Sequence, residues 1–424
     1  MSNYVIRNNK ILTDDLGNKI VLPKYEQKDE IRAIWISTVA NIDLPLLTTT
    51  DQYKEEIIKR LDHLQRLNFN TIFFQVRPLN DAFYPSELAP WSRYITGKEN
   101  KDPGFDVLRF VLNEAHKRNF ELHAWLNPYR IANSEEVFEK LSNKNFAKKR
   151  PDLVINSLEN INGKINKRYI LNPGEPEVQQ YILDVIKELL NNYPDLDGIH
   201  FDDYFYLNKR LMGIDENALD YQTFVKYKND INDIELFRRQ SVNIVIKGTY
   251  DLVNNHNLKH NKNAKFGVSP TGIWRNGIEV GGSKTKGQEH YVDLAADSKY
   301  WVEQNWLHYI LPQVYWPFDK FNNLGEPVAP FANIVNWWSN ISTNTQVDLI
   351  IGIGLYRQDE NEPAHDWFYP NELIEQIKYI QKIPNVIGCS IFTYKTLNNE
   401  NENIQKAIET LNTKYWTKQV KHPW

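Results

Sequence analysis

The feature that most constrains the fold is an alternation of short apolar segments with amphipathic helical patterns, repeated eight times along 424 residues. The apolar segments are rich in β-branched and aromatic residues, which is typical of buried strands. They occupy residues 31–38, 71–78, 121–128, 198–205, 266–270, 309–316, 349–356 and 386–394. Between them, as in EVQQYILDVIKELLNNY at residues 177–193, apolar residues recur every three or four positions, which predicts helices. Eight such units predict an α/β fold of the parallel (β/α)8 TIM-barrel type.

A doubly wound parallel sheet is the alternative arrangement of these units. No glycine-rich turn follows the first apolar segment, IRAIWIST, which argues against a nucleotide-binding sheet. We therefore expect residues 30–400 to form a TIM-barrel catalytic domain. Residues 1–29 precede it, and KILTDDLGNKIVLP predicts an N-terminal β-hairpin extension over the floor or edge of the barrel. Residues 401–424 should form a C-terminal helix and tail, and the polar insertions 131–168 and 207–233 should form long loops over the catalytic face.

Charge and composition limit the partners of this chain. The formal net charge of −4 gives no electrostatic footprint for nucleic acid. No apolar run approaches the length that spans a membrane, so we expect no membrane segment. The first residues, MSNYVIRNNKILTDD, lack the apolar core of a signal peptide, which predicts a cytoplasmic protein as written, or a secreted or lipid-anchored one if an export segment was removed. The 12 Trp and 23 Tyr fit either a sugar-binding cleft or a large core.

Polar side chains interrupt several predicted strands in their latter part. Both faces of a parallel barrel strand are normally buried, so such strands should be almost wholly apolar. The interruptions recur at two-residue spacing, which places them on one face of each strand. They are Gln75 and Arg77 in the second strand, His123 and Asn127 in the third, His200 and Asp202 in the fourth, and Gln313 and Tyr315 in the sixth. Because catalytic residues of TIM barrels lie at these strand ends, the pattern predicts a polar pocket there.

Two adjacent carboxylates, Asp202 and Asp203, end the fourth apolar segment in DGIHFDDYFY. Alternation along a strand points Asp202 toward the barrel axis with His200, while Asp203 can turn over the cleft where the strand ends. Carboxylates this close do not both ionise easily, so the pKa of one rises and that group can act as an acid. In the alternative interpretation, one Asp caps the next turn and the other pairs with Arg77 or Arg130.

Long motifs in order cover nearly the whole predicted barrel, from Glu30 to Leu397. They include FFQVRPLNDAFYPSELAPWSRYITG, ELHAWLNPYRI, YILNPGEPEVQQYI, DGIHFDDYFY, FGVSPTGIWRN and ADSKYWVEQNWLHYILPQVYW. These motifs resemble the family 10-like glycoside hydrolases of bacteria. The resemblance implies a TIM-barrel glycosidase of bacterial cell-wall glycan, with peptide-free peptidoglycan strands as the substrate class. Many members of that family are exported or lipid-anchored.

The resemblance leaves two catalytic schemes open. The Asp202–Asp203 pair is similar to the acidic pairs of N-acetylhexosaminidases in which the sugar's own 2-acetamido oxygen attacks the anomeric carbon. This similarity implies Asp203 as acid and base, Asp202 as the group that orients the acetamido N–H, and Tyr315, in QVYW, as an assisting hydroxyl. In an inverting scheme, a carboxylate across the cleft would instead act as base. Its candidates are Asp81, Glu289 and Asp297.

Further motif residues are expected to bind substrate. Arg77 and Arg130 could each bind a carboxylate, such as the lactyl group of N-acetylmuramic acid, or hold Asp202 in its ionised state. Aromatic rings can stack on sugar faces, and the candidates are Trp35, Trp125, Trp274 and Trp316. The other expected ligands of the glycan are Gln75, Asp81, His123, Asn127, His200, Tyr204 and Gln313.

Two rival classes of function are compatible with this sequence. A metal-dependent hydrolase could use His123, His200 and Asp202 to bind Zn²⁺, but both histidines lie in mid-strand, away from the rim. A glycan-binding barrel without activity would not need a paired acid with a raised pKa. We expect an O-glycosyl hydrolase with a glycan substrate and with neither a metal nor another cofactor.

Overall fold

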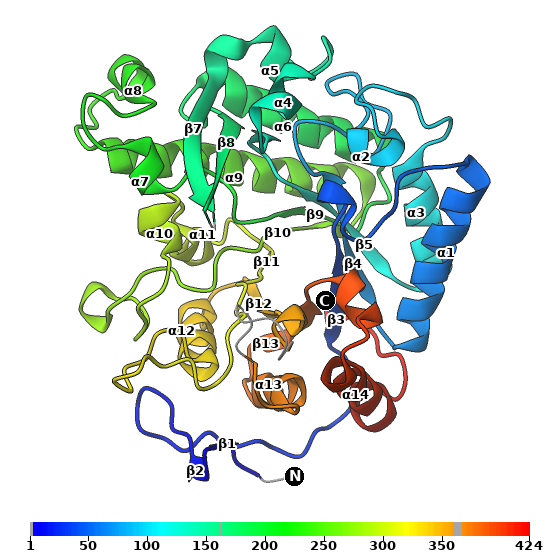
Figure 1. Cartoon of the computed structure of the whole chain (residues 1–424), viewed down its shortest axis with the longest axis vertical. Coiled ribbons are helices and arrows are strands. Elements are labelled where there is room, and N and C mark those ends of the chain that lie inside the picture. Colours follow the sequence, from blue (N-terminus) through cyan, green and yellow to red (C-terminus); the bar gives the residue numbers. More distant parts are fainter. Residues whose placement is uncertain (1–2, 162, 359–366) are drawn as a thin grey trace.

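The computed structural model describes residues 3–161, 163–358 and 367–424, and it confirms the predicted TIM barrel (Figure 1). Eight parallel strands close in the order β10-β11-β12-β13-β3-β4-β5-β9. Their bounds are β3 Ile31–Ile36, β4 Thr71–Arg77, β5 Glu121–Leu126, β9 Gly198–Phe201, β10 Lys265–Val268, β11 Tyr309–Ile310, β12 Asp348–Ile353 and β13 Val386–Ile391. The main helix after each strand is, in the same order, α1 Thr50–Arg66, α3 Val107–His116, α6 Pro176–Asn192, α9 Ile234–His260, α11 Ser298–Glu303, α12 Phe331–Ser342, α13 Glu372–Gln381 and α14 Glu402–Thr410.

Burial on both faces explains why the strands read as continuous apolar runs. Side chains such as Trp35, Phe73 and Tyr309 fill the inside of the barrel as one cluster. Their neighbours along the strands, such as Ile34 and Phe74, point outward into a larger core beneath the helices. The two-residue alternation of a strand therefore separates an inner core from an outer core.

The N-terminal extension is a small antiparallel unit, as predicted, and it lies at the edge of the barrel. Strands β1, Ile6–Arg7, and β2, Lys10–Ile11, pair with each other, and Thr13 pairs with Lys19 around the expected turn. Arg7 is buried and forms an ion pair with Glu372 of α13. This contact fixes the extension against the outside of the barrel rather than beneath its floor.

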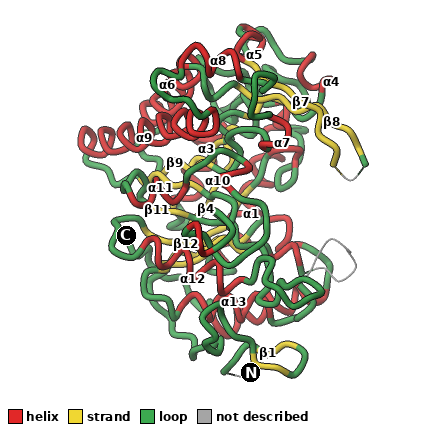
Figure 2. Tube along the Cα trace, turned by 90° about the vertical axis from the view of Figure 1, so that its left-hand side faces the viewer, coloured by secondary structure: helices red, strands yellow, loops and turns green. Residues whose placement is uncertain are grey.

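The chain after α14 covers the floor of the barrel. The imidazole of His422 lies 2.9 Å from the backbone oxygen of Asn70, which immediately precedes β4. The indole N–H of Trp424 donates to Glu121 at 2.9 Å, and its ring lies 5.6 Å from that of Tyr309. Figure 2 shows the C terminus at one end of the barrel and the β7–β8 hairpin projecting from the other end. The expected boundary at residue 400 falls between β13 and α14, and α14 is the helix of the eighth unit, with its apolar face in the outer core.

The two insertions contain more regular structure than the expected loops. Strands β6 Arg130–Ala132, β7 Val154–Ile161 and β8 Lys164–Leu171 form an antiparallel sheet in the order β6-β8-β7. Short helices complete the insertions and loops: α2 Arg93–Thr96, α4 Glu135–Glu139, α5 Phe146–Lys149, α7 Lys209–Met212, α8 Tyr221–Tyr227 and α10 His290–Asp293. In the described parts of the chain, no helix has both the length and the apolar character needed to cross a membrane.

Candidate active site

Asp202 follows the last residue of β9 and points into the barrel mouth. Its carboxylate accepts the indole N–H of Trp125, from β5, at 3.3 Å and the backbone N–H of Tyr204 at 3.2 Å. The residue is only 3% exposed. Burial raises the pKa of Asp202 well above its usual range, and the negative charge of Asp203 raises it further. Asp202 is therefore a buried acceptor that binds a proton more readily than an ordinary aspartate.

Asp203, the next residue along the chain, is half-buried and therefore more exposed than Asp202. It lines a cavity of about 540 Å³, bordered by β6, β8 and the segment after β9, which we call the Asp203 cavity. Gln313 donates a hydrogen bond to the Asp203 carboxylate. Burial raises the pKa of Asp203, while this hydrogen bond and the charge of Arg130 oppose the rise. One carboxylate of the pair is thus buried and the other borders an open space.

Arg130 and Tyr204 form the rim of the Asp203 cavity. The Arg130 guanidinium lies 4.3 Å from the centre of the Tyr204 ring, and the ring is 47% exposed. The negative charge of Asp203 raises the pKa of Tyr204 to about 12, so this hydroxyl keeps its proton at neutral pH. The cavity thereby presents a cation, an exposed ring and a carboxylate to the same space, and Arg168 adds a second cation to its lining.

Tyr315 lies in the segment after β11, which is separated from β9 by β10 alone. Burial raises the pKa of its hydroxyl well above the usual range, and the charges of Asp203 and Asp202 contribute to the rise. Its ring packs edge-on against Trp35, with centroids 6.4 Å apart. The two carboxylates and the Tyr315 hydroxyl are therefore close enough to influence one another electrostatically, as a shared site requires.

Gln75 and Asn127 form a hydrogen-bonded link in the wall of the mouth. Gln75 Nε2 donates to Asn127 Oδ1 at 2.7 Å, and Gln75 Oε1 accepts the backbone N–H groups of Thr38 and Val39 at 2.8 Å each. Gln75 therefore fixes the loop after β3 and has no exposed surface to offer a sugar. Asn127 Nδ2 is buried and has no hydrogen-bond partner among the described residues.

His123 and His200 lie in the barrel interior, contrary to the expectation that they bind substrate. Burial lowers the pKa of His200, so its ring is neutral and carries one proton. Trp35 donates to His200 Nε2 at 3.4 Å, the Ser269 hydroxyl lies 3.0 Å from the same nitrogen, and the second ring nitrogen is Nδ1. That Nδ1 lies 3.0 Å from the Tyr309 hydroxyl, which lies 3.0 Å from His123 Nδ1. The Tyr309 hydroxyl has one proton, so it can donate to one imidazole and accept from the other. Both imidazoles are fully buried, so neither is accessible to a bound substrate.

Arg77 and Asp81 also lie outside the mouth. The pairing of β4 with β5 shifts between Gln75 and Arg77, which is a β-bulge. The bulge turns Arg77 into the helical layer, where it donates to Asn80 at 2.8 Å and to Tyr181 at 3.2 Å. Asp81 is buried and accepts the backbone N–H of Leu79 at 3.2 Å. Neither side chain is placed to bind a glycan or to pair with Asp202.

The candidates for the base of an inverting scheme are engaged elsewhere. Glu289 accepts the backbone N–H of Asn276 at 2.6 Å, within the loop after β10. Asp297 accepts the indole N–H of Trp274 at 2.9 Å and caps α11. Asp81 is the third candidate, and it is buried as described above. The described residues thus provide no second carboxylate from this set opposite Asp203.

The aromatic candidates divide between the mouth and the surrounding core. Trp125 borders Asp202, whereas Trp35 is almost fully buried against Phe73. Trp274 is 7% exposed and stacks on Trp337 with centroids 5.6 Å apart, so its faces are occupied. Trp316 is half-buried and packs against the outer core. Of the four candidates, Trp125 therefore contacts the carboxylate pair directly.

The positions of His123, His200 and Asp202 do not fit the metal site that the rival hypothesis needs. The two imidazoles are bridged by a tyrosine hydroxyl, and Asp202 accepts from an indole instead. Within residues 3–161, 163–358 and 367–424, no group of three His, Cys, Asp or Glu side chains is placed to hold a metal ion.

Several residues at the mouth were not anticipated from the sequence. Phe392 follows β13, and its ring lies 5.8 Å from Trp35 and 5.7 Å from Tyr315. Tyr356 follows β12 and lies 5.9 Å from Tyr315. Phe392 comes directly after β13 and Tyr356 three residues after β12, and this position just past a strand end is the signal that could have identified them.

The closed parallel barrel with paired carboxylates at the carboxyl ends of its strands is the architecture of TIM-barrel glycoside hydrolases. The chain belongs to the glycosyl hydrolase-like 10 family, which matches residues 30–368 and confirms the resemblance seen in the motifs. Glycosyl hydrolase YngK of Bacillus subtilis (strain 168) is 38% identical over 389 residues, which span 90% of this chain and 71% of that protein. Glycosyl hydrolase DigH of Escherichia coli (strain K12) is 32% identical over 421 residues, which span 96% of this chain and 92% of that protein.

Solved structures with the same fold are much more distant in sequence. The glycoside hydrolase domain of PgaB (BpsB) from Bordetella bronchiseptica has a TM-score of 0.56 at 12% identity, covering 91% of this chain and 98% of that chain. The catalytic domain of a β-amylase from Paenibacillus polymyxa has a TM-score of 0.52 at 10% identity, covering 92% and 99% respectively. At this level of identity the two structures support the fold alone.

Proposed function

We propose that this chain is a glycosidase that hydrolyses glycans containing N-acetylhexosamine, and that peptide-free peptidoglycan strands are its substrate. The observation that carries the proposal is the carboxylate pair at the end of β9, where Asp202 is buried and Asp203 lines a cavity. Membership of the glycosyl hydrolase-like 10 family supports the reaction class. The substrate class rests on the residues around the pair.

Asp203 is the proposed acid and base. Because burial raises its pKa, Asp203 holds a proton more readily than an ordinary aspartate, and its half-exposed position lets it reach a glycosidic oxygen. In the first step Asp203 donates this proton to the leaving oxygen, while the acetamido carbonyl oxygen of the sugar attacks the anomeric carbon. The carbon–oxygen bond to the leaving sugar breaks with its electron pair. In the second step Asp203 takes a proton from water, and the hydroxide attacks the same carbon and opens the oxazoline ring.

Asp202 and Tyr315 are the proposed partners of the acetamido group. Burial and the charge of Asp203 raise the pKa of Asp202, and its hydrogen bonds from Trp125 and from the backbone of Tyr204 oppose that rise. A sugar N–H would be a third donor to the carboxylate and would further favour its ionised form. The Tyr315 hydroxyl keeps its proton because its pKa is raised, so it can donate to the acetamido oxygen. The two carboxylates would then have different roles, with Asp203 protonated as the acid and Asp202 ionised as the acceptor of the acetamido N–H.

Arg130 is the residue that argues for an acidic sugar. Its guanidinium lies on the rim of the Asp203 cavity, next to an exposed ring, and can bind a carboxylate in bidentate fashion. N-acetylmuramic acid supplies such a carboxylate in its lactyl group when no peptide is attached to it. Arg168 lines the same cavity, although it also pairs with Glu159 at 2.8 Å.

The test is the release of reducing ends from oligomers of alternating N-acetylglucosamine and N-acetylmuramic acid. Asp203→Asn should lower turnover by at least about a hundredfold while retaining binding of the oligomer, since general acid catalysis contributes about that much. The matched control is Asp230→Asn, which makes the same change at an exposed loop position. Normal cleavage by Asp203→Asn would refute the acid assignment, and binding without any wild-type cleavage would favour a glycan-binding protein.

A thiazoline mimic of the cyclised acetamido intermediate separates the two catalytic schemes. It should inhibit the wild-type enzyme in competition with the oligomer if the sugar takes part in the reaction. An enzyme that cleaves the oligomer but is not inhibited would contradict acetamido participation and would support an inverting mechanism.

A further inference from the structure

A second large cavity opens at the barrel mouth, on the side away from the Asp203 cavity. It has a volume of about 800 Å³ and is lined by segments after β3, β12 and β13 and by part of α1. We call it the Arg60 cavity, and its principal residues are Asp43, Arg60, Tyr356, Phe392, Lys395 and Asn398. In the closed order of strands, β13 is four positions from β9, which places the two cavities on opposite sides of the mouth.

The catalytic pair lies between the two cavities. Asp203 lines the first cavity, and its charge, with that of Asp202, acts on Tyr315. The Tyr315 ring lies 5.9 Å from Tyr356 and 5.7 Å from Phe392, and both of these rings line the Arg60 cavity. A continuous wall of side chains therefore leads from one cavity, past the reacting groups, to the other.

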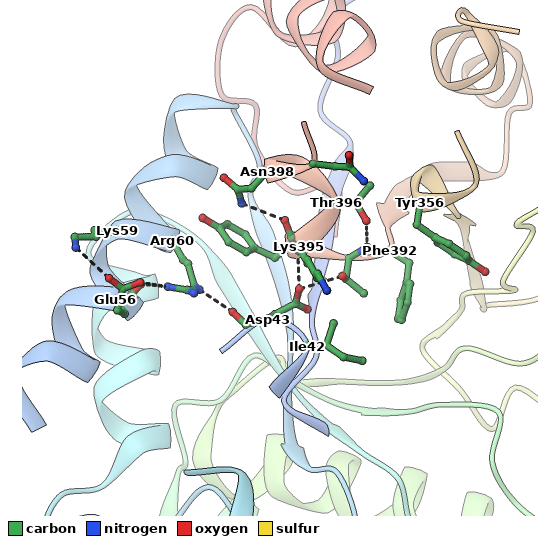
Figure 3. Close-up of a pocket in the computed structure, with 13 residues that line it drawn as sticks. Ile42, Asp43, Glu56, Lys59, Arg60, Tyr356, Phe392, Lys395, Thr396 and Asn398 are labelled. Atoms are coloured by element: carbon green, nitrogen blue, oxygen red, sulfur yellow. Dashed lines mark hydrogen bonds and ion pairs between the residues drawn. The ribbon is translucent and has the colours of Figure 1, made fainter. Parts of the chain in front are cut away.

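The Arg60 cavity has an aromatic side and a polar side (Figure 3). Phe392 and Tyr356 are half-buried rings whose centroids lie 6.0 Å apart. Exposed Lys395 and Asn398, both in the 3-10 helix Tyr394–Asn398, supply polar groups. Exposed rings combined with amide and ammonium donors suit a sugar, which has apolar faces and a rim of hydroxyl groups.

Arg60, Glu56 and Asp43, unlike the exposed Lys395 ammonium, are engaged in contacts within the wall of this cavity. Arg60 donates to Glu56 at 2.7 Å, and its Nε donates to the backbone oxygen of Asp43 at 2.7 Å. The Asp43 carboxylate accepts the backbone N–H groups of Ser37 and Lys395 at 2.6 Å each. Because Asp43 and Arg60 hold the loops after β3 and β13 and helix α1 together, the groups left to bind a ligand are the aromatic pair and the exposed donors Lys395 and Asn398.

We propose that the Arg60 cavity is a saccharide subsite for the same glycan chain, so that the substrate lies across the mouth and is cleaved at an internal linkage. This inference rests on the proposed function, because it takes the Asp202–Asp203 pair as the reacting centre. The chain would continue from the bond at Asp203 over Tyr315 and place a further sugar between the aromatic pair and Asn398.

The experiment compares substrates of different length in three variants. Asn398→Trp fills the cavity, Lys395→Ala with Asn398→Ala removes its exposed donors, and Lys414→Ala is a control at an exposed position on the last helical turn. For an octasaccharide, the two cavity variants should raise KM about tenfold with little change in kcat, as expected for the loss of one or two hydrogen bonds. For the shortest cleaved oligomer, kcat/KM should stay within about twofold of wild type. Products of the octasaccharide should shift from internal to terminal cleavage.

Binding separates the failure of this inference from the failure of the proposed function. Calorimetric titration of the octasaccharide into Asp203→Asn protein, with and without Asn398→Trp, measures the subsite without turnover. If Asn398→Trp leaves octasaccharide affinity unchanged, the subsite is refuted whether or not the wild type cleaves glycans. If it weakens affinity about tenfold while the wild type releases no reducing ends, the subsite is supported and the glycosidase assignment is refuted.

Discussion

Replacing Tyr309 by Phe tests the hydrogen-bond chain in the barrel interior. The Tyr309 hydroxyl lies 3.0 Å from Nδ1 of His123 and 3.0 Å from Nδ1 of His200, and all three side chains are fully buried. Without the hydroxyl, Nδ1 of His200 and Nδ1 of His123 both lose their hydrogen-bond partner. A buried polar group without a partner costs about 1–3 kcal/mol, so the free energy of unfolding should fall by about 2–6 kcal/mol.

The assay is urea unfolding followed by tryptophan fluorescence, with Tyr53→Phe as the matched control. Tyr53 is also buried, but its hydroxyl has no hydrogen-bond partner among the described residues, so its removal should change stability by less than about 0.5 kcal/mol or increase it slightly. The affinity of the folded Tyr309→Phe protein for glycan should be unchanged. Equal losses of stability in the two variants would refute the hydrogen-bond chain. A loss of glycan affinity in Tyr309→Phe would indicate that the two histidines do take part in substrate binding.

Three further predictions follow from the charges and rings described above. Arg130→Ala removes a positive charge that lowers the pKa of Asp203. The alkaline limb of the plot of kcat/KM against pH, where the proposed acid loses its proton, should therefore move up by about one pH unit. Arg130→Lys should shift this limb less, and a limb that does not move in Arg130→Ala would contradict the prediction. Arg7→Leu leaves Glu372 buried without its cation and should lower unfolding free energy by about 3–5 kcal/mol at pH 8. That loss should shrink below pH 7, where the carboxyl, with a pKa of about 7 in the wild type, is protonated; a loss independent of pH would argue against an unpaired charge. Trp424→Ala should cost about 2 kcal/mol in urea unfolding, because it removes a half-buried ring from the barrel floor; no measurable loss would mean that the tail does not contribute to stability.

The barrel was predictable because its strands and helices differ in the period of their apolar residues. Eight continuous apolar segments joined by helical patterns allow few other arrangements, and the observed strands fall within or overlap all eight predicted ranges. The sheet formed by β6, β7 and β8 was not predictable from composition, because Lys and Asn are abundant in these segments and are depleted in strands generally. The segment VINSLENI, residues 154–161, has no regular alternation of apolar and polar residues, so its pattern does not indicate a strand either.

The site was only partly predictable, for two physical reasons. Strand alternation correctly places Asp202 and His200 on the inner face, but it does not say how deep each lies. Deep inner positions of a TIM barrel are filled by packed side chains, and His200 belongs to those layers whereas Asp202 reaches the mouth. The orientation of Arg77 was not predictable for another reason, because the bulge between Gln75 and Arg77 turns Arg77 outward, on the same side as Val76. Bulges depend on pairing with the neighbouring strand and leave no regular mark in a single sequence.

The column of Trp35, His200, Tyr309 and His123 has an evolutionary consequence. Each of these side chains is a hydrogen-bond partner of the next one, so a substitution at one position leaves a buried polar group without its partner until the other positions change as well. Among relatives, these positions should covary, with phenylalanine at position 309 accompanied by apolar residues in place of both histidines. Homologues would then fall into two groups, one with these polar side chains and one with an apolar barrel interior. Sequences that combine features of both groups should be rare.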